Sequence, residues 1–231
     1  FQFKDGDRIV LLGNTLFERE GNYGYIETLF TRHFPSKSLT FRNLGYSAET
    51  VEGESRAMFD TPKVGFQRMI GQVVEASPTV IFISFGQNAA YQGEEELQRF
   101  MDGYRNLVNI LEASTEARFV VLSPPALEKL EPPLPEPAEQ NARVEKYVEA
   151  IRKFSEEKGF FFVDLFHPLL KAYEEDSSRH WTNNTIHFNP YGYWRLGLVL
   201  LDAFGLEEKD WKAIVDLGKL QIDGAEVRFD S

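Results

Sequence analysis

Residues 8–20 read RIVLLGNTLFERE, an apolar run that stops at Gly13-Asn14-Thr15 and continues as a polar stretch that favours a helix. Four further β-rich runs follow along the chain, and several of them are nearly continuous in apolar residues. Such runs are typical of parallel strands that are covered on both faces. We therefore expect strands at residues 8–13, 38–45, 79–86, 117–124 and 159–166.

Helical patterns lie between these runs, and the alternation of strand and helix predicts an α/β domain with a mostly parallel sheet. The segment PPLPEP at 132–137 fits a loop between a strand and a helix better than an interdomain linker. We assign residues 1–205 to this domain and 206–231 to a C-terminal extension that could begin a further module. In the extension we expect a helical turn or two, then a strand and an Asp-Gly turn. The expected helices span 22–34, 66–77, 94–114, 136–159 and 191–205.

The composition excludes several classes of function. Acidic side chains outnumber basic ones by 36 to 25, so the formal charge is −11 and the pI about 4.9. This charge repels phosphate backbones and anionic membrane surfaces, and we expect no nucleic-acid partner. The absence of cysteine removes disulfides, thiolate metal sites and cysteine nucleophiles. No apolar run is long enough to span a bilayer, and the acidic clusters lack metal-ligand spacing, so we expect no membrane span, metal or cofactor.

Polar residues and glycines follow three of the expected strands. In parallel sheets, ligands lie outside the carboxyl ends of the strands. A fourth polar segment, TNNTIHFNPYGY at 182–193, carries His187 three residues before a helix that starts with proline. Together these segments supply a hydroxyl, two oxyanion donors and a base, which is the set that acyl transfer requires. The three strand ends are Gly13-Asn14-Thr15, Asn43-Leu44-Gly45 and Gly86-Gln87-Asn88.

These four segments occur in the same order as the motif blocks of the SGNH or GDSL-type hydrolases and resemble them. The resemblance extends from about residue 7 to residue 205. The resemblance implies a three-layer, flavodoxin-like α/β sandwich with a mostly parallel five-stranded sheet. It also implies that Thr15 is the nucleophile and His187 the general base. The Thr15 N–H, the Gly45 N–H and the Asn88 side chain would form the oxyanion hole. The matching blocks are GNTL at 13–16, Gly45 in RNLGYSAET, GQNA at 86–89 and NTIHFNPYGY at 184–193.

The sequence departs from the family pattern at three positions. Thr15 replaces the serine nucleophile, Asn184 replaces the aspartate of the triad, and Ala89 replaces an acid of the third block. The threonine methyl group stiffens the side chain and crowds an approaching carbonyl. A neutral asparagine offers no charge to a histidine cation, and the corresponding change in a serine protease lowers kcat by about 10⁴. Slow hydrolysis remains compatible with these residues.

Each site residue also has a structural interpretation that the sequence leaves open. Thr15 could cap the helix that follows it, and His187 could be a turn or packing residue. Asn88 and Gly45 could serve turn geometry alone. The order of the four blocks favours a functional site.

We expect hydrolysis of a carboxylic ester, with an O-acetyl or similar small acyl group on a carbohydrate as the substrate. Transfer of the acyl group to an alcohol would use the same covalent intermediate. The alternative is a catalytically inactive module that binds a glycan or acylated ligand within a larger exported protein. The resemblance favours an exported, periplasmic or extracellular protein, and the oligomeric state stays open. The candidates for substrate contact are Asn14, Tyr91, Trp181 and Phe188.

Overall fold

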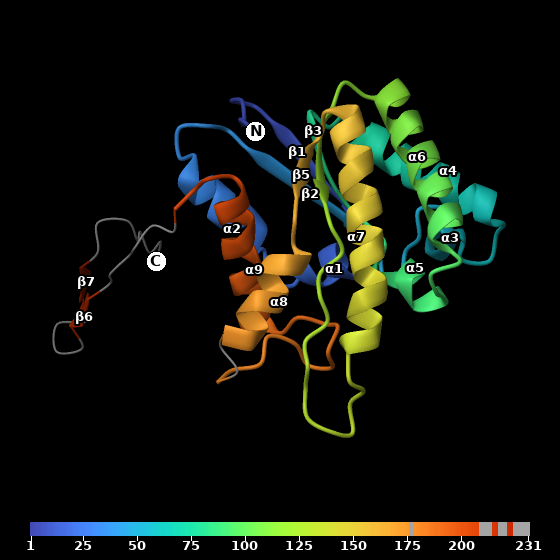
Figure 1. The fold of residues 1–231 in the computed structure, drawn as a ribbon. Helices are drawn as coiled ribbons and strands as arrows, with labels where there is room; N and C mark the ends of the chain where they lie inside the picture. The colour runs from blue at the N-terminus through green and yellow to red at the C-terminus, as the bar shows by residue number, and fades with distance from the viewer. Residues whose placement is uncertain (176–177, 208–213, 217–220, 224–231) are drawn as a thin grey trace.

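The computed structural model describes residues 1–175, 178–207, 214–216 and 221–223 (Figure 1). Its main sheet has five strands in the order β2-β1-β3-β4-β5, and every neighbouring pair is parallel. This is the flavodoxin-like order, so the predicted fold class is confirmed. The strands are β1 (Arg8–Gly13), β2 (Thr40–Gly45), β3 (Val80–Ser84), β4 (Arg118–Leu122) and β5 (Phe161–Val163).

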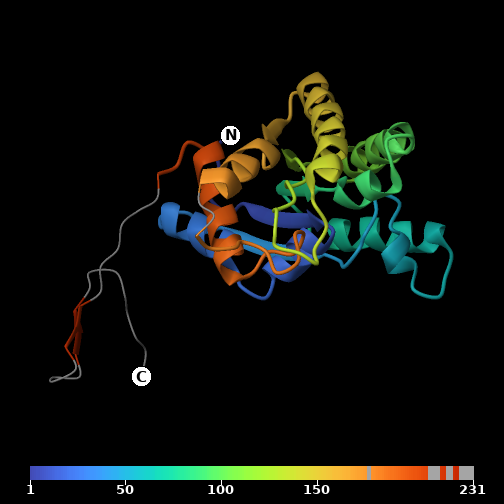
Figure 2. The ribbon, with the colours of Figure 1, turned by 60° about the horizontal axis from the view of Figure 1, so that its bottom comes forward.

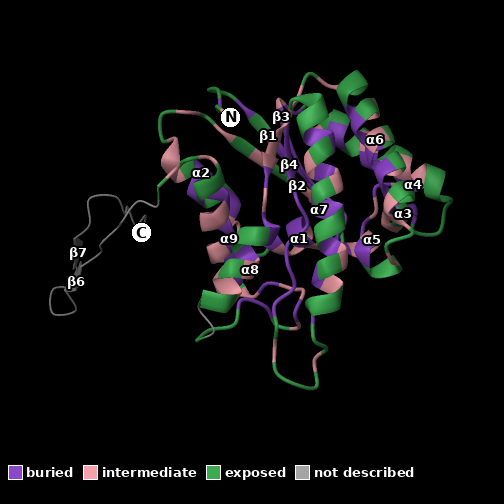
Figure 3. Cartoon of the chain, viewed as in Figure 1, coloured by how far each residue is buried: buried purple, intermediate pink, exposed green. Residues whose placement is uncertain are grey.

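Two layers of helices cover the sheet. Figure 1 shows α2, α8 and α9 on one side of the strands and α4, α6 and α7 on the other, and Figure 3 shows their buried faces turned inward. Covering on both faces explains why β3 is buried along its whole length. The helices are α1 (Thr15–Glu20), α2 (Tyr25–His33), α3 (Glu54–Ala57), α4 (Pro62–Glu75), α5 (Gln87–Gln92), α6 (Leu97–Ser114), α7 (Ala138–Lys158), α8 (Phe166–Glu175) and α9 (Pro190–Ala203).

The carboxyl ends of the central strands are level with one another. Gly13 at the end of β1 pairs with Gly45 of β2 and with Ser84 of β3. The loops after these strands, together with α1 and α5, therefore lie at one edge of the sheet, which Figure 2 turns toward the viewer. Gly45 has no room for a side chain, because a Cβ there would lie 2.2 Å from the backbone nitrogen of Glu18 in α1.

The C-terminal extension is described only in part. β6 (Ile214–Asp216) and β7 (Gln221–Asp223) form an antiparallel pair. The helical turns expected before this strand fall largely on residues 208–213, and the glycine of the Asp-Gly turn is residue 224; both lie outside the described residues. Within the part of the chain that is described, no helix is long and apolar enough to cross a membrane. The division at residue 205 stays a prediction.

Candidate active site

Thr15 is the first residue of α1, directly after β1. The preceding residue, Asn14, caps this helix, because its Oδ1 accepts the N–H of Leu16 at 3.2 Å. The interpretation of Thr15 as the helix cap is therefore wrong. Asn14 is only 3% exposed, so its side chain serves the helix and leaves no surface for the substrate contact we expected. Thr15 is half-buried, and its Oγ1 accepts the N–H of Ala48 at 2.9 Å.

The backbone donor that faces Thr15 thus comes from Ala48. The N–H of Gly45, which we expected in this place, donates instead to Oδ1 of Asn43 at 2.8 Å. Ala48 has a φ of 54°, a left-handed conformation, and its N–H donates to the Thr15 hydroxyl. Nothing in the sequence marks Ala48, because glycine is the usual residue in this conformation.

A buried ion pair holds the loop that presents Ala48. The carboxylate of Glu49 accepts hydrogen bonds from the guanidinium of Arg56 and from the Thr50 and Ser55 N–H groups, the latter two at 3.0 Å. Arg56 also donates to the carbonyl of Leu44 at 2.5 Å, and both charged side chains are almost fully buried. The pair and its hydrogen bonds thus connect Leu44 at the end of β2 with Thr50, Ser55 and Arg56.

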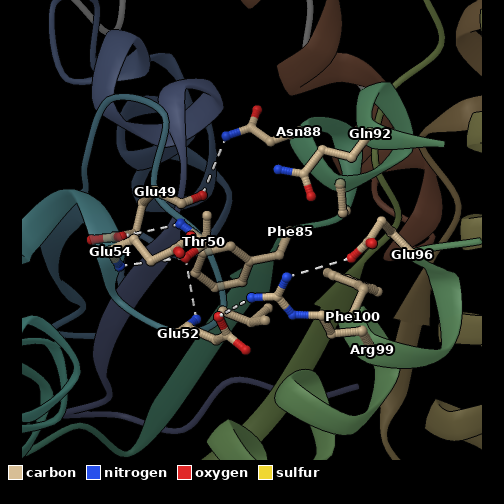
Figure 4. Close-up of a pocket in the computed structure, with 13 residues that line it drawn as sticks. Glu49, Thr50, Glu52, Glu54, Phe85, Asn88, Gln92, Glu96, Arg99 and Phe100 are labelled. Carbon is tan, nitrogen blue, oxygen red and sulfur yellow. Dashed lines mark hydrogen bonds and ion pairs between the residues drawn. The ribbon is translucent and has the colours of Figure 1, made fainter. Parts of the chain in front are cut away.

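Asn88 lies at the start of α5 and points toward the same loop (Figure 4). Its Nδ2 lies 3.4 Å from the carbonyl oxygen of Glu49, one residue beyond Ala48. A cavity of about 90 Å³ opens beside it, with Phe85 and Phe100 among its apolar lining residues. Neither Thr15 nor His187 lines this cavity. The side-chain amide of Asn88 thus contacts the backbone of the loop that carries Ala48.

His187 and Asn184 form a pair with a defined hydrogen-bond direction. Oδ1 of Asn184 accepts the backbone N–H of His187 at 2.9 Å, and its Nδ2 lies 3.1 Å from Nδ1 of the imidazole. A backbone N–H can only donate, so it fixes the amide with its oxygen toward the backbone. The amide NH₂ then faces Nδ1, which must accept. A neutral His187 therefore carries its proton on Nε2.

The surroundings of His187 favour its neutral form. Burial lowers the pKa of His187 below its usual value of 6.5, and the nearby Arg19 guanidinium lowers it further. Both Arg19 and Glu18, which acts in the opposite direction, belong to the helix that Thr15 begins. The Tyr193 hydroxyl also donates to the carbonyl of Leu16 at 2.9 Å, which ties α9 to α1.

The described residues thus bring Thr15 and His187 to neighbouring segments without a hydrogen bond between them. A base would need a free lone pair on Nε2, whereas the Asn184 contact leaves a proton there. Arg19 is a site neighbour that the sequence reasoning missed, although its place one helical turn after Thr15 could have indicated it.

The aromatic candidates divide into two groups. Trp181 is fully buried and Phe188 is 3% exposed, so neither offers a face to a sugar ring, and our expectation for them is wrong. Both pack in the hydrophobic core. Tyr91, on α5 beside Asn88, is 46% exposed and remains available for contact. The described ranges contain no group of three or more His, Asp or Glu side chains placed to hold a metal.

Comparison with known proteins relates this arrangement to a family. The solved structures that share the fold include the following two. One is BT4096, a gut microbial diltiazem-metabolizing enzyme, with a TM-score of 0.74 and 20% identity over 96% of this chain. This chain spans about half of it, 52%. The other is Axe2, an acetylxylan esterase from Geobacillus stearothermophilus, with a TM-score of 0.68 and 17% identity over 88% of this chain and 96% of Axe2.

Similarity to curated protein sequences is not detectable. The family evidence is nevertheless direct, because residues 6–195 match the GDSL-like lipase/acylhydrolase family. That match covers most of the chain and includes all four segments that carry Thr15, Ala48, Asn88 and His187. The chain therefore belongs to the GDSL-like lipase/acylhydrolase family.

Proposed function

We propose that the protein is a carboxylic ester hydrolase that slowly removes small O-acyl groups from carbohydrate. The observation that carries the proposal is the hydrogen bond from the Ala48 N–H to Thr15 Oγ1, at 2.9 Å. It places an oxyanion donor directly beside the candidate nucleophile. Family membership supports ester chemistry, and the likeness to an acetylxylan esterase supports an acetylated carbohydrate as the substrate.

In the proposed reaction, Nε2 of His187 takes the Thr15 hydroxyl proton while Oγ1 attacks the carbonyl carbon of the ester. Negative charge on the carbonyl oxygen is stabilised by the N–H groups of Thr15 and Ala48 and by the Asn88 amide. The tetrahedral intermediate expels the sugar alkoxide oxygen, which takes the proton from His187 and leaves as the free hydroxyl. Water then attacks the acyl-threonine, again assisted by His187, and releases the carboxylic acid.

Asn184 explains why we propose slow turnover. For Nε2 to accept a proton, Nδ1 must carry one, and it then faces the amide NH₂ of Asn184. Turning the amide over would present its NH₂ to the backbone N–H of His187 and leave that donor unpaired, at a cost of about 1–3 kcal/mol. The histidine cation would also lack the carboxylate that normally stabilises it.

A second function is favoured by the same contact. With a proton on Nε2, His187 can donate a hydrogen bond to a ligand oxygen but cannot accept the Thr15 proton. This is the chemistry of a module that binds an acylated glycan without cleaving it. Such a module would fit within a larger exported protein.

The deciding experiment measures acetate release from acetylated xylooligosaccharides and from an activated aryl acetate. We expect slow release by the wild-type protein and none above background by Thr15→Ala or His187→Ala. Thr28→Ala, an exposed position on α2, is the matched control and should keep the wild-type rate. Equal rates for wild type and Thr15→Ala would overturn the hydrolase proposal. Saturable binding of the acetylated oligosaccharide without acetate release would favour the binding module instead.

A further inference from the structure

We propose that Glu128 is a positioning residue that holds the loop of residues 181–189, called here the His187 loop, in the arrangement that orients the imidazole. This inference rests on the proposed role of His187, but its test reads the imidazole directly. Glu128 lies in the long connection between β4 and α7. Figures 1 and 2 both show this connection, in yellow-green, beside the orange His187 loop. Glu128 is 4% exposed.

The backbone on which Glu128 sits is itself fixed. The side chain of Asn141, in α7, accepts the N–H of Leu127 at 2.8 Å and donates to the carbonyl of Leu127 at 3.0 Å. One side chain thus pairs both backbone groups of the residue before Glu128. Because α7 packs on the sheet, the connection has a firm anchor at this point.

From this anchor, Glu128 contacts the His187 loop at two places. Its carboxylate accepts the N–H of Trp181 at 3.0 and 3.1 Å, and the N–H and hydroxyl of Thr182 at 2.7 and 2.6 Å. Its own N–H donates to the carbonyl of Thr185 at 3.0 Å. Thr185 has a φ of 71°, and this bond pairs its carbonyl at the turn.

Backbone pairing carries the constraint from Thr182 to His187. Thr182 forms an antiparallel bridge with Phe188, and the N–H of Asn183 donates to the carbonyl of His187 at 2.9 Å. Thr182 and Asn183 therefore form one side of a narrow turn, and His187 and Phe188 form the other. Asn184, which contacts Nδ1, lies between the two positions that Glu128 holds.

The contacts use both oxygens of the carboxylate, because Oε2 accepts from both Thr182 groups and Oε1 accepts the N–H of Trp181 at 3.0 Å. The Trp181 and Thr182 groups donate to Glu128, and a carboxylate only accepts. The side chain of His180 also approaches, with Nδ1 at 3.3 Å from Oε1. Glutamine has nearly the same shape but would turn an NH₂ toward one of these donors. If Glu128 only filled space, the Glu128→Gln protein would behave like wild type. If Glu128 positions the His187 loop, the substitution should disturb the loop.

The test compares Glu128→Gln with Glu131→Gln, an exposed acid on the same connection. Histidine ¹⁵N NMR distinguishes the two neutral tautomers, and a His187→Ala spectrum assigns the signals. We expect Glu131→Gln to match wild type and Glu128→Gln to lose the single Nε2–H signal of His187. If ester turnover is measurable, we expect kcat to fall about tenfold or more with KM little changed, as for one buried donor left unpaired.

A milder pair of variants covers the case in which Glu128→Gln does not fold. Thr182→Val removes only the hydroxyl bond to Glu128, and Thr182→Ser keeps it. We expect Thr182→Val to broaden or shift the His187 signals and Thr182→Ser to restore them. A lower melting temperature with unchanged His187 signals would show a merely structural role and overturn the inference. Absence of ester turnover in wild type would refute the proposed function while leaving this readout intact.

Discussion

Replacing Asn184 by aspartate should convert His187 from a hydrogen-bond donor into a base at the Thr15 hydroxyl. In the wild-type protein, Oδ1 of Asn184 accepts the His187 N–H at 2.9 Å, and the amide NH₂ faces Nδ1 at 3.1 Å. Aspartate keeps the first contact and puts a carboxylate oxygen at the second. Nδ1 must then carry a proton, and Nε2 gains a free lone pair.

The size of the effect has two parts. Removing the amide-turning penalty of about 1–3 kcal/mol corresponds to about 5- to 150-fold in rate. Restoring the negative charge adds stabilisation of the histidine cation, and the two effects together account for about 10⁴ in the serine-protease comparison. We therefore expect kcat/KM of Asn184→Asp to exceed wild type by about 10² to 10⁴, the remaining deficit being due to the Thr15 methyl group.

The pH dependence of the rate provides a second test of the Asn184→Asp prediction. Activity requires neutral His187, so it rises with pH through the His187 pKa, which burial and Arg19 lower in the wild-type protein. A carboxylate beside the imidazole favours the cation and raises that pKa. The acid limb of the rate profile should therefore move to higher pH in Asn184→Asp than in wild type.

Aryl acetate hydrolysis followed from pH 4 to 9, together with histidine ¹⁵N NMR, tests both parts. Asn183→Asp is the matched control, because residue 183 is exposed and its substitution adds the same charge on the same loop without the Nδ1 contact. An Asn184→Asp protein no faster than the control would refute the reasoning. So would a wild-type His187 that carries its neutral-state proton on Nδ1.

Three further predictions concern the nucleophile, a buried acid and the ion pair. Thr15→Ser should raise the rate, and combined with Asn184→Asp it should give more than the product of the two single gains, measured by a double-mutant cycle, because both changes act on one proton transfer. Burial raises the pKa of Glu20 from 4.5 to about 7. Between these pH values the folded protein keeps a proton on Glu20 that the unfolded chain has lost, so the free energy of unfolding should fall as pH rises from about 4.5 to 7. Glu20→Gln should remove this slope and stabilise the protein above pH 7 by up to about 3 kcal/mol, as seen in urea unfolding at several pH values; an unchanged slope would contradict the assignment. Glu49→Gln leaves the buried Arg56 charge without its carboxylate and should cost about 3–5 kcal/mol in the same urea assay, whereas a loss below 1 kcal/mol would show that the pair does not hold the loop.

The sequence by itself determined the fold class, and it predicts the general place of the site. Apolar runs alternating with helical patterns predict a parallel sheet because local periodicity and the covering of both faces are properties of the residues themselves. The family blocks likewise predict that Thr15 and Asn184 are the altered members of a catalytic set, since each block has a set position after its strand, and this stays a prediction.

Tertiary contacts decided which backbone and side-chain atoms lie beside Thr15 and His187. Gly45 ends β2 and Ala48 lies three residues later; the N–H of Gly45 donates to Asn43, whereas Ala48, in a left-handed conformation, donates its N–H to Thr15. An alanine in this conformation has no sequence signature. The loop held by Glu49 and Arg56, not a local preference, maintains it.

Burial and long-range pairing were equally beyond the sequence. An aromatic ring can pack in a core or stack on a sugar with the same apolar surface, so the sequence alone does not distinguish the two uses. The folded chain buries Trp181 completely. The carboxylate of Glu128 meets the Trp181 and Thr182 N–H groups across more than 50 residues of chain. Such contacts arise only when the β4–α7 connection and the His187 loop meet at one edge of the sheet, so the proton position on His187 is a property of the fold.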